Sequence, residues 1–298
     1  MVWRVMAANI SLLGILTAFS ATEGRTAELG ELVDSARLLA TGGVSQIEGA
    51  GGGGLSTWAL ITGYGSRDAV GGNVHATIAD FDDFRLSSYG TAVGIFDRVE
   101  LSYARQRFDT EQAGAALGLG AGFTFEQDVF GAKARLIGDA VYDQDRWLPQ
   151  ISAGVQYKRA NHGNIIRAIG GASDHGVDYY LAASKLILEH GVLLNATVRA
   201  TRANQFGLLG FGGPRNDDHT IQFEGSGVWL IDRHVALGFD YRTKPDNLTF
   251  AEEDDAYDVF IALFPSKHFS LTAAYVDLGD VALQGEQNGA YFSIQTGF

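Results

Sequence analysis

The feature that most constrains the fold of this 298-residue chain is a period-two alternation of apolar and polar residues. In residues 192–200, the even-numbered positions carry Val, Leu, Ala, Val and Ala, and the odd-numbered ones carry Leu, Asn, Thr and Arg. Successive side chains of an extended strand point to opposite sides, so this pattern predicts a β-strand with one apolar face. Similar segments recur over 130–136, 151–158, 221–229, 235–242, 257–263 and 269–275. The sequence therefore predicts an all-β fold.

The alternating segments are compatible with two architectures. In a soluble sandwich, the apolar faces point into a core and the polar faces into water. In a membrane barrel, the apolar faces meet lipid and the polar faces line the lumen. The segments run for about ten residues, the length that a tilted strand needs to cross a bilayer, which favours the barrel. Aromatic residues also stand near segment ends, as in the girdles of membrane barrels: Tyr103, Tyr157, Trp229, Tyr241 and Tyr275.

The connections between segments alternate in length, which also favours an antiparallel transmembrane β-barrel. Short, polar connections that suit tight hairpin turns lie at 95–99, 189–191, 230–235 and 264–269. Longer and more polar ones lie at 108–126, 159–176, 204–218, 244–255 and 278–289. Short turns on one side and long loops on the other are typical of the periplasmic and extracellular ends of outer-membrane barrels.

The number of strands follows from counting back from the C-terminal strand. This gives about 12 strands, beginning near Gly72, because closed bacterial barrels have even strand numbers. Residues 55–65 are also strand-like. They either form part of a barrel of up to 14 strands together with residues 43–49, or lie inside the lumen.

The chain divides into three predicted parts. Residues 1–20 have a positive end, an apolar core and a small-residue cleavage site, which predicts a signal peptide and export to the outer membrane. Residues 21–54 are expected to hold a short amphipathic helix, over 27–40, and a Gly-rich linker. Residues 55–298 are expected to form the barrel.

Composition removes several classes of function. The chain has no Cys, which excludes disulfides, thiolate metal sites and Cys nucleophiles. A formal net charge of −13 argues against nucleic-acid binding, which depends on cationic surface. We expect no cofactor and no metal site, because the acidic clusters lie in predicted solvated loops and none matches the calcium-loop pattern.

Catalysis is not predicted either. Ser173, Asp174 and His175 lie in one predicted external loop, but a Ser-His-Asp hydrolase needs these groups within hydrogen-bond reach in a defined order. The polarity of a loop explains these residues equally well.

The polar faces suggest what the interior does. Twelve strands enclose more space than side chains fill in an eight-stranded barrel, but less than a general porin encloses. The leading hypothesis is a narrow channel for small polar or hydrophobic solutes. The alternative is a non-conducting structural, assembly or export-associated outer-membrane protein, with its N-terminal segment as a plug. The candidate lumen-lining residues are Glu100, Lys133, Arg135, Lys158, Arg199, Glu224, Asp240, Arg242 and Asp258.

The last strand places Phe292, Ile294 and Phe298 on one apolar face. It resembles the closing strand of bacterial outer-membrane barrels, in which a terminal Phe belongs to the signal read by the barrel-assembly machinery. The resemblance implies that machinery as a partner, together with outer-membrane lipids and lipopolysaccharide.

Longer motifs carry a second likeness. They resemble an uncharacterised proteobacterial family, a domain of unknown function in exported, outer-membrane-like proteins. The resemblance covers roughly residues 42–298 and assigns no catalytic or binding residue. The motifs are Val99–Asp109, Gly138–Pro149, Thr201–Phe211, Tyr241–Leu248 and Leu271–Gly279.

Overall fold

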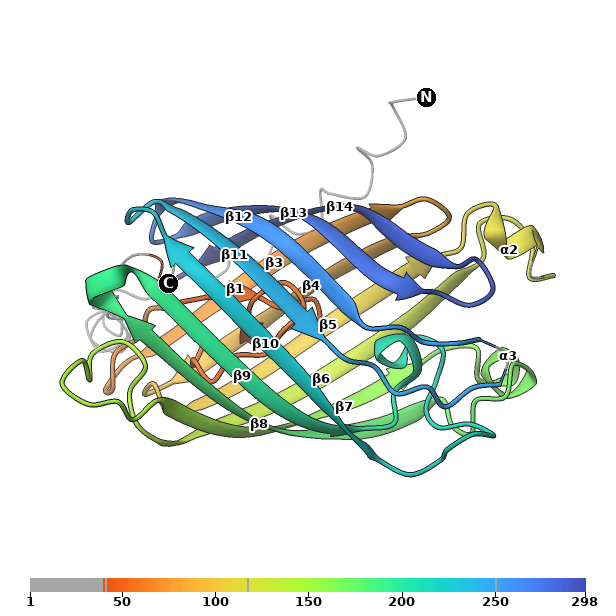
Figure 1. Cartoon of the computed structure of the whole chain (residues 1–298), viewed down its shortest axis with the longest axis horizontal. Helices are drawn as coiled ribbons and strands as arrows, with labels where there is room; N and C mark the ends of the chain where they lie inside the picture. Colours follow the sequence, from red (N-terminus) through yellow and green to blue (C-terminus); the bar gives the residue numbers. More distant parts are fainter. Residues whose placement is uncertain (1–39, 41, 117, 250) are drawn as a thin grey trace, which may run out of the picture.

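Twelve antiparallel strands form one closed barrel (Figure 1), which confirms the predicted fold class. The structure, a computed structural model, describes residues 40, 42–116, 118–249 and 251–298. The barrel strands are β3 (Val70–Phe81), β4 (Arg85–Ile95), β5 (Val99–Asp109), β6 (Thr124–Ile137), β7 (Gln150–Ala160), β8 (His175–Ile187), β9 (Val192–Thr201), β10 (Thr220–Leu230), β11 (Val235–Arg242), β12 (Ala256–Ser266), β13 (Phe269–Asp280) and β14 (Glu286–Gly297).

The barrel closes where β14 pairs with β3. In this antiparallel pair Phe292 lies opposite Ile78, and Gly297 lies opposite Asn73. Each of the twelve strands therefore has a neighbour on both sides, so the sheet of the barrel has no edge with unpaired backbone groups.

The exposure of side chains follows the period-two pattern of the sequence. On the outside, Phe223 and Phe292 are each 57% exposed, whereas their neighbours Glu224 and Tyr291 are 3% and 2% exposed. Such an inverted arrangement, with large apolar side chains outside and charged ones inside, suits a barrel surrounded by lipid.

The two ends of the barrel differ in their connections. The long-loop end carries residues 82–84, 110–123, 161–174, 202–219, 243–255 and 281–285; it also holds the short helices α2 (Ala113–Ala116) and α3 (Gly163–Ala168) and the 3₁₀ turn η2 (Asn204–Gly207). The short-turn end carries residues 96–98, 138–149, 188–191, 231–234 and 267–268, with the 3₁₀ turn η1 (Leu188–His190). The predicted short connections are thus confirmed, and so are four of the five long ones. The predicted long connection 278–289 is wrong, because β13 and β14 extend into it and leave only residues 281–285 between them. The long connection 138–149 at the short-turn end was not predicted.

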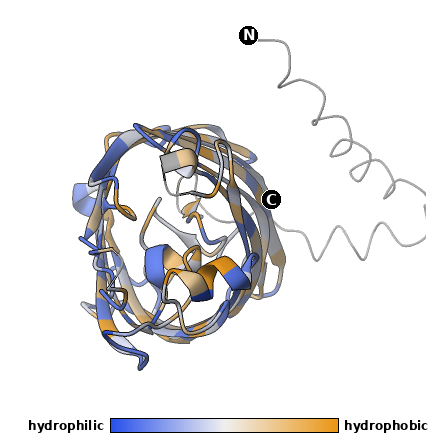
Figure 2. Cartoon of the chain, turned by 90° about the vertical axis from the view of Figure 1, so that its right-hand side faces the viewer, coloured by the Kyte–Doolittle hydropathy of each residue, from blue (hydrophilic) through white to orange (hydrophobic). Residues whose placement is uncertain are grey.

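Residues 42–65, here called the plug, lie inside the barrel, and every one of them is buried. They contain the two-residue strands β1 (Val44–Ser45) and β2 (Gly51–Gly52), which pair with each other and not with the barrel. Seen along the barrel in Figure 2, segments of chain lie within the closed wall. Residues 55–65 therefore lie in the lumen, which was one of the two predicted alternatives. The first barrel strand begins at Val70, later than the expected residue 55.

The predicted signal peptide (1–20) and most of the predicted helix over 27–40 lie outside the described residues. In the part of the chain that the structure describes, no helix has the length and apolar character that a membrane span requires.

Candidate functional site: the plugged lumen

The plug is a loop that rises from the short-turn end and returns to it. Val44 and Trp58 pack in an apolar cluster near the short-turn end, and Ile47 packs in another near the long-loop end. At its exit, the backbone N–H of Tyr64 donates to the carbonyl oxygen of Phe298 at 3.0 Å. The glycines of 49–54, which the sequence suggested as a linker, let the plug backbone approach the wall closely. A Cβ at Gly53, for example, would lie 2.2 Å from Asp240 Oδ2.

Carboxylates of the wall hold the backbone of the plug. The N–H of Gly51 donates to Glu100 at 3.0 Å, and the N–H of Thr57 donates to Glu224 at 2.7 Å. The N–H of Leu55 donates to Asp240 at 3.0 Å. Hydrogen bonds to ionised acceptors are stronger than neutral ones, so these contacts fix the plug without relying on its side chains.

Six buried side chains form a closed ring of alternating charge, here called the charge ring. Lys158 bonds Glu48 of the plug and lies 2.7 Å from Asp178, while Arg242 lies 2.8 Å from Glu48. The remaining members are Arg199 and Glu224. The ring therefore runs from β7 through β8, β9, β10 and β11, and closes through the plug: Glu48, Lys158, Asp178, Arg199, Glu224, Arg242.

Arg199 is the most connected member of the charge ring. Its guanidinium lies 2.5 Å from Glu224 and 3.3 Å from Asp178, and it donates to Thr57 Oγ1 of the plug at 2.8 Å. Gln156 accepts a further bond at 2.6 Å, and the ring of Tyr180 lies 5.1 Å from its Cζ. Because its charge is satisfied on all sides, Arg199 can be fully buried.

The nine lumen-lining candidates are all buried inside the barrel. Lys158, Arg199, Glu224 and Arg242 belong to the charge ring. Lys133 lies 3.0 Å from Glu100, and Arg135 lies 2.7 Å from Asp97 at the short-turn end. Asp240 and Asp258 lie opposite each other on β11 and β12, and neither has an ion-pair partner among the described residues.

Glu48 and Thr57 are parts of this site that the sequence did not identify. Glu48 lies in the predicted Gly-rich linker and Thr57 in the strand-like residues 55–65, and neither segment was assigned an inward face. A signal was nevertheless present, since Glu48 is an isolated charge in an otherwise uncharged run from 41 to 66. An uncharged run of this kind is suited to burial, and the one charge in it has to find a partner.

Apolar layers close the lumen at the long-loop end. Phe84 and Phe108 stack with ring centroids 4.9 Å apart, and Phe206 and Leu209 of the loop 202–219 pack in the same cluster. Phe206 also lies 4.5 Å from the guanidinium carbon of Arg242, a cation–π contact that links this layer to the charge ring.

A buried pair ties two long loops together above this layer. Lys244 and Glu253 approach to 3.5 Å, and Glu253 accepts the backbone N–H of Gln205 at 2.8 Å. Burial raises the pKa of Glu253 to about 7 and lowers the pKa of Lys244. Both shifts have the same cause, because burial penalises the charged form of either group.

The external Ser, Asp and His do not form a catalytic triad. Asp174 Oδ1 lies 2.8 Å from His175 Nδ1, and Ser173 Oγ lies 3.3 Å from the same nitrogen. In a triad the carboxylate and the nucleophile contact opposite nitrogens of the ring. Among the described residues, no group of three or more His, Cys, Asp or Glu could hold a metal ion.

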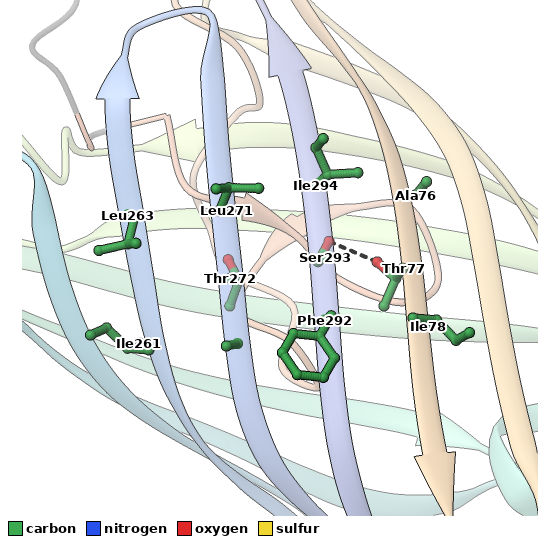
Figure 3. A pocket seen from close by; sticks show the side chains of 11 residues that line it. Ala76, Thr77, Ile78, Ile261, Leu263, Leu271, Thr272, Phe292, Ser293 and Ile294 are labelled. Atoms are coloured by element: carbon green, nitrogen blue, oxygen red, sulfur yellow. Dashed lines mark hydrogen bonds between the residues drawn. The ribbon is translucent and has the colours of Figure 1, made fainter. Parts of the chain in front are cut away.

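The outer wall carries a groove of about 530 Å³ across β12, β13, β14 and β3 (Figure 3). Ala76 and Ala273 leave room between larger side chains, among them Ile261, Phe292 and Ile294. The lining is almost wholly apolar, so the groove belongs to the lipid-facing surface of the barrel.

Comparisons with known proteins agree with this architecture. The structure of the KdgM porin matches with a TM-score of 0.50 and 9% identity, covering 76% of this chain and 99% of that chain. The NanC porin matches with a TM-score of 0.50 and 7% identity, covering 76% and 98%. The COG4313 outer membrane channel from Pseudomonas putida F1 matches with a TM-score of 0.45 and 15% identity, covering 77% and 95%. At such identities the likeness to the two porins shows a shared fold.

At the level of sequence, no curated protein matches the chain. A family model described as "Protein of unknown function (DUF3034)" matches residues 41–295, which include the plug and nearly all of the barrel. The chain therefore belongs to this family, and its described part folds as a plugged barrel of the outer-membrane type.

Proposed function

We propose that this protein is an outer-membrane channel for small solutes, closed at rest by the plug and conducting when the plug moves. The observation that carries the proposal is the chemistry of the contact between wall and plug. Wall residues such as Glu100 and Lys133 bind backbone groups of the plug, through Gly51 N–H and through the carbonyl oxygens of Gly51 and Trp58.

Such contacts suit a removable plug. Backbone groups present the same donors and acceptors as water or a polar solute, so the wall would keep a continuous polar lining after the plug had left. If the lumen served only to hold the plug, apolar side chains would stabilise it more than buried ion pairs do, because desolvating charges is costly. The small-solute range follows from the twelve strands, whose interior is narrower than that of a general porin.

Deleting residues 42–65 should convert a closed protein into an open one. In planar lipid bilayers, the purified wild-type barrel should show rare openings, and the deletion variant should show frequent, discrete conductance steps. A deletion variant that folds, shown by heat-modifiable mobility on gels, but does not conduct would favour the structural alternative.

A reversible lock gives a matched control with the plug still present. Ser45 Oγ of the plug lies 3.2 Å from Asn73 Oδ1 of β3, and the chain has no native Cys. Oxidised Ser45→Cys/Asn73→Cys should abolish the wild-type openings, and a reductant should restore them, since the plug would be held to β3 at both ends. Openings that persist in the oxidised protein would contradict a moving plug.

We also infer that Phe298 contributes to recognition by the assembly machinery. Deleting it removes an aromatic contact and three backbone hydrogen bonds, one with Tyr64 and two with Gly72, together worth about 2–5 kcal/mol. The rest of the β14–β3 pairing remains, so refolding in detergent should remain nearly normal. Assembly in cells should fall sharply, as measured by heat-modifiable mobility. Phe223→Ala is the matched control, since Phe223 is an outward aromatic on another strand. Equal losses in cells for both variants would reduce Phe298 to a packing role.

A further inference from the structure

The charges inside the barrel do not balance. Along the lumen wall and the plug, the charge ring is neutral, and Glu100 is paired with Lys133. Arg135 and Lys244, at the two ends of the lumen, have carboxylate partners of their own. Asp240 and Asp258 remain, both at most 1% exposed, and in their ionised forms they leave an excess of two negative charges in the described lumen.

The two carboxylates face the same point. Asp240 and Asp258 are directly opposite each other in the β11–β12 register, where side chains on one face stand about 5 Å apart at Cβ. A Cβ at Gly54 of the plug would lie 2.7 Å from Asp258 Oδ2 and 3.8 Å from Cζ of Tyr291, the carbon that bears the hydroxyl. Two acids and a phenol therefore converge on the Gly53–Gly54 turn.

Several oxygen atoms at this point lack hydrogen-bond partners within the described structure. They are Oδ1 of Asp240, Oδ1 of Asp258 and the hydroxyl of Tyr291, which is 2% exposed. Buried carboxylates in proteins are paired with cations, coordinate metals or take up a proton, because an isolated buried charge is very costly.

We propose that Asp240 and Asp258, together with Tyr291, bind one hard divalent cation that fastens the Gly53–Gly54 turn to the barrel wall. One divalent ion removes the excess of two negative charges. The ligands are all oxygen atoms, the set that Ca²⁺ and Mg²⁺ prefer, and the irregular arrangement favours Ca²⁺, which tolerates flexible coordination. Backbone carbonyl groups and water would complete the shell around the two carboxylates.

Calcium binding can be measured directly on the refolded, chelator-treated protein in lipopolysaccharide-free detergent. We expect calorimetry to show one Ca²⁺ bound per chain, and Asp240→Asn and Asp258→Asn each to weaken binding by roughly tenfold or more. Asp232→Asn, in an exposed turn, should bind like the wild type and controls for surface binding. Absence of a wild-type binding signal would overturn the proposal without any variant having to fold.

A second readout follows the plug itself. Ser56 is buried beside Asp240, its backbone N–H 3.4 Å from Oδ2. In a Ser56→Cys protein, Ca²⁺ should slow labelling by a thiol reagent, and adding Asp258→Asn should remove the effect of Ca²⁺. If Ca²⁺ changes nothing and mild acid alone slows labelling, protons neutralise the pair and the proposal fails. Neither readout uses conductance, so this site can fail or hold independently of the channel function.

Discussion

Replacing Arg199 with methionine should lower the free energy of unfolding by about 3–5 kcal/mol. The variant would leave Glu224 and Asp178 buried with one cationic partner each, Arg242 at 3.6 Å and Lys158 at 2.7 Å, and the charge ring would carry a net negative charge. It would also remove the bond to Thr57 of the plug. A urea titration in lipid vesicles measures the loss, and a lower midpoint at an unchanged slope is the expected form.

Arg105 provides the matched control. It also contacts two acids, Glu126 at 2.6 Å and Asp128 at 3.4 Å, but its side chain is 36% exposed on the outer surface. Arg105→Met should cost only about 0–1 kcal/mol, because water solvates the remaining acids. Combining Arg199→Met with Glu224→Gln should recover part of the loss, since the double variant restores the charge balance of the ring. Similar losses for Arg199→Met and Arg105→Met would show that the ring does not stabilise the barrel.

Placing arginine on the outer face at mid-strand should cost about 2–4 kcal/mol. Ile261 lies in the middle of β12, is 40% exposed and points away from the lumen. In a bilayer this position meets hydrocarbon, which solvates a guanidinium poorly. The loss should appear in a folding titration in vesicles of Ile261→Arg against the wild type.

The position of an outward residue along its strand provides a test of whether lipid or water surrounds the barrel. Ile221 is also an outward apolar residue, 57% exposed, but it lies near the start of β10 at the long-loop end. Arginine there should cost about 0–1 kcal/mol, because the charge can reach the interface. Equal costs at Ile261 and Ile221 would argue that no hydrocarbon layer surrounds β12, and would reopen the soluble alternative.

The sequence was sufficient for the wall of the barrel because a strand converts period two directly into two faces. Phe223 and Glu224 fall on opposite sides for that reason alone. The alternation does not predict which side chains pack against the inward face of a strand, because that depends on three-dimensional packing. Gly238 faces inward as its position requires, yet a Cβ there would lie 2.1 Å from the ring of Phe260 on the next strand. Even a serine at this position would force that ring to move.

The burial of residues in the loops and the plug could not be predicted from the period-two pattern, for a related reason. Glu253 lies in an acidic run, a pattern that predicts a solvent-exposed loop, but it is buried against Lys244. The side chain of its neighbour Glu252 is 78% exposed. A thiol label for the outer surface therefore belongs at Glu252 and not at Glu253. Gln205, whose backbone N–H donates to Glu253, lies 48 positions away in another loop, and no local period predicts such a contact.

The carbonyl oxygen of Phe298 accepts hydrogen bonds from both Tyr64 of the plug and Gly72 of β3, each at 3.0 Å. Ser45 of the plug likewise bonds Gln295, 250 positions along the chain. These contacts set an order of events in folding, because the plug cannot take its final bonds before β14 arrives to close the sheet. The plug therefore forms its final hydrogen bonds only after the last strand has paired. The entropy cost of closing so long a loop slows both the closure of the barrel and the seating of the plug. Closing the barrel and seating the plug become one step.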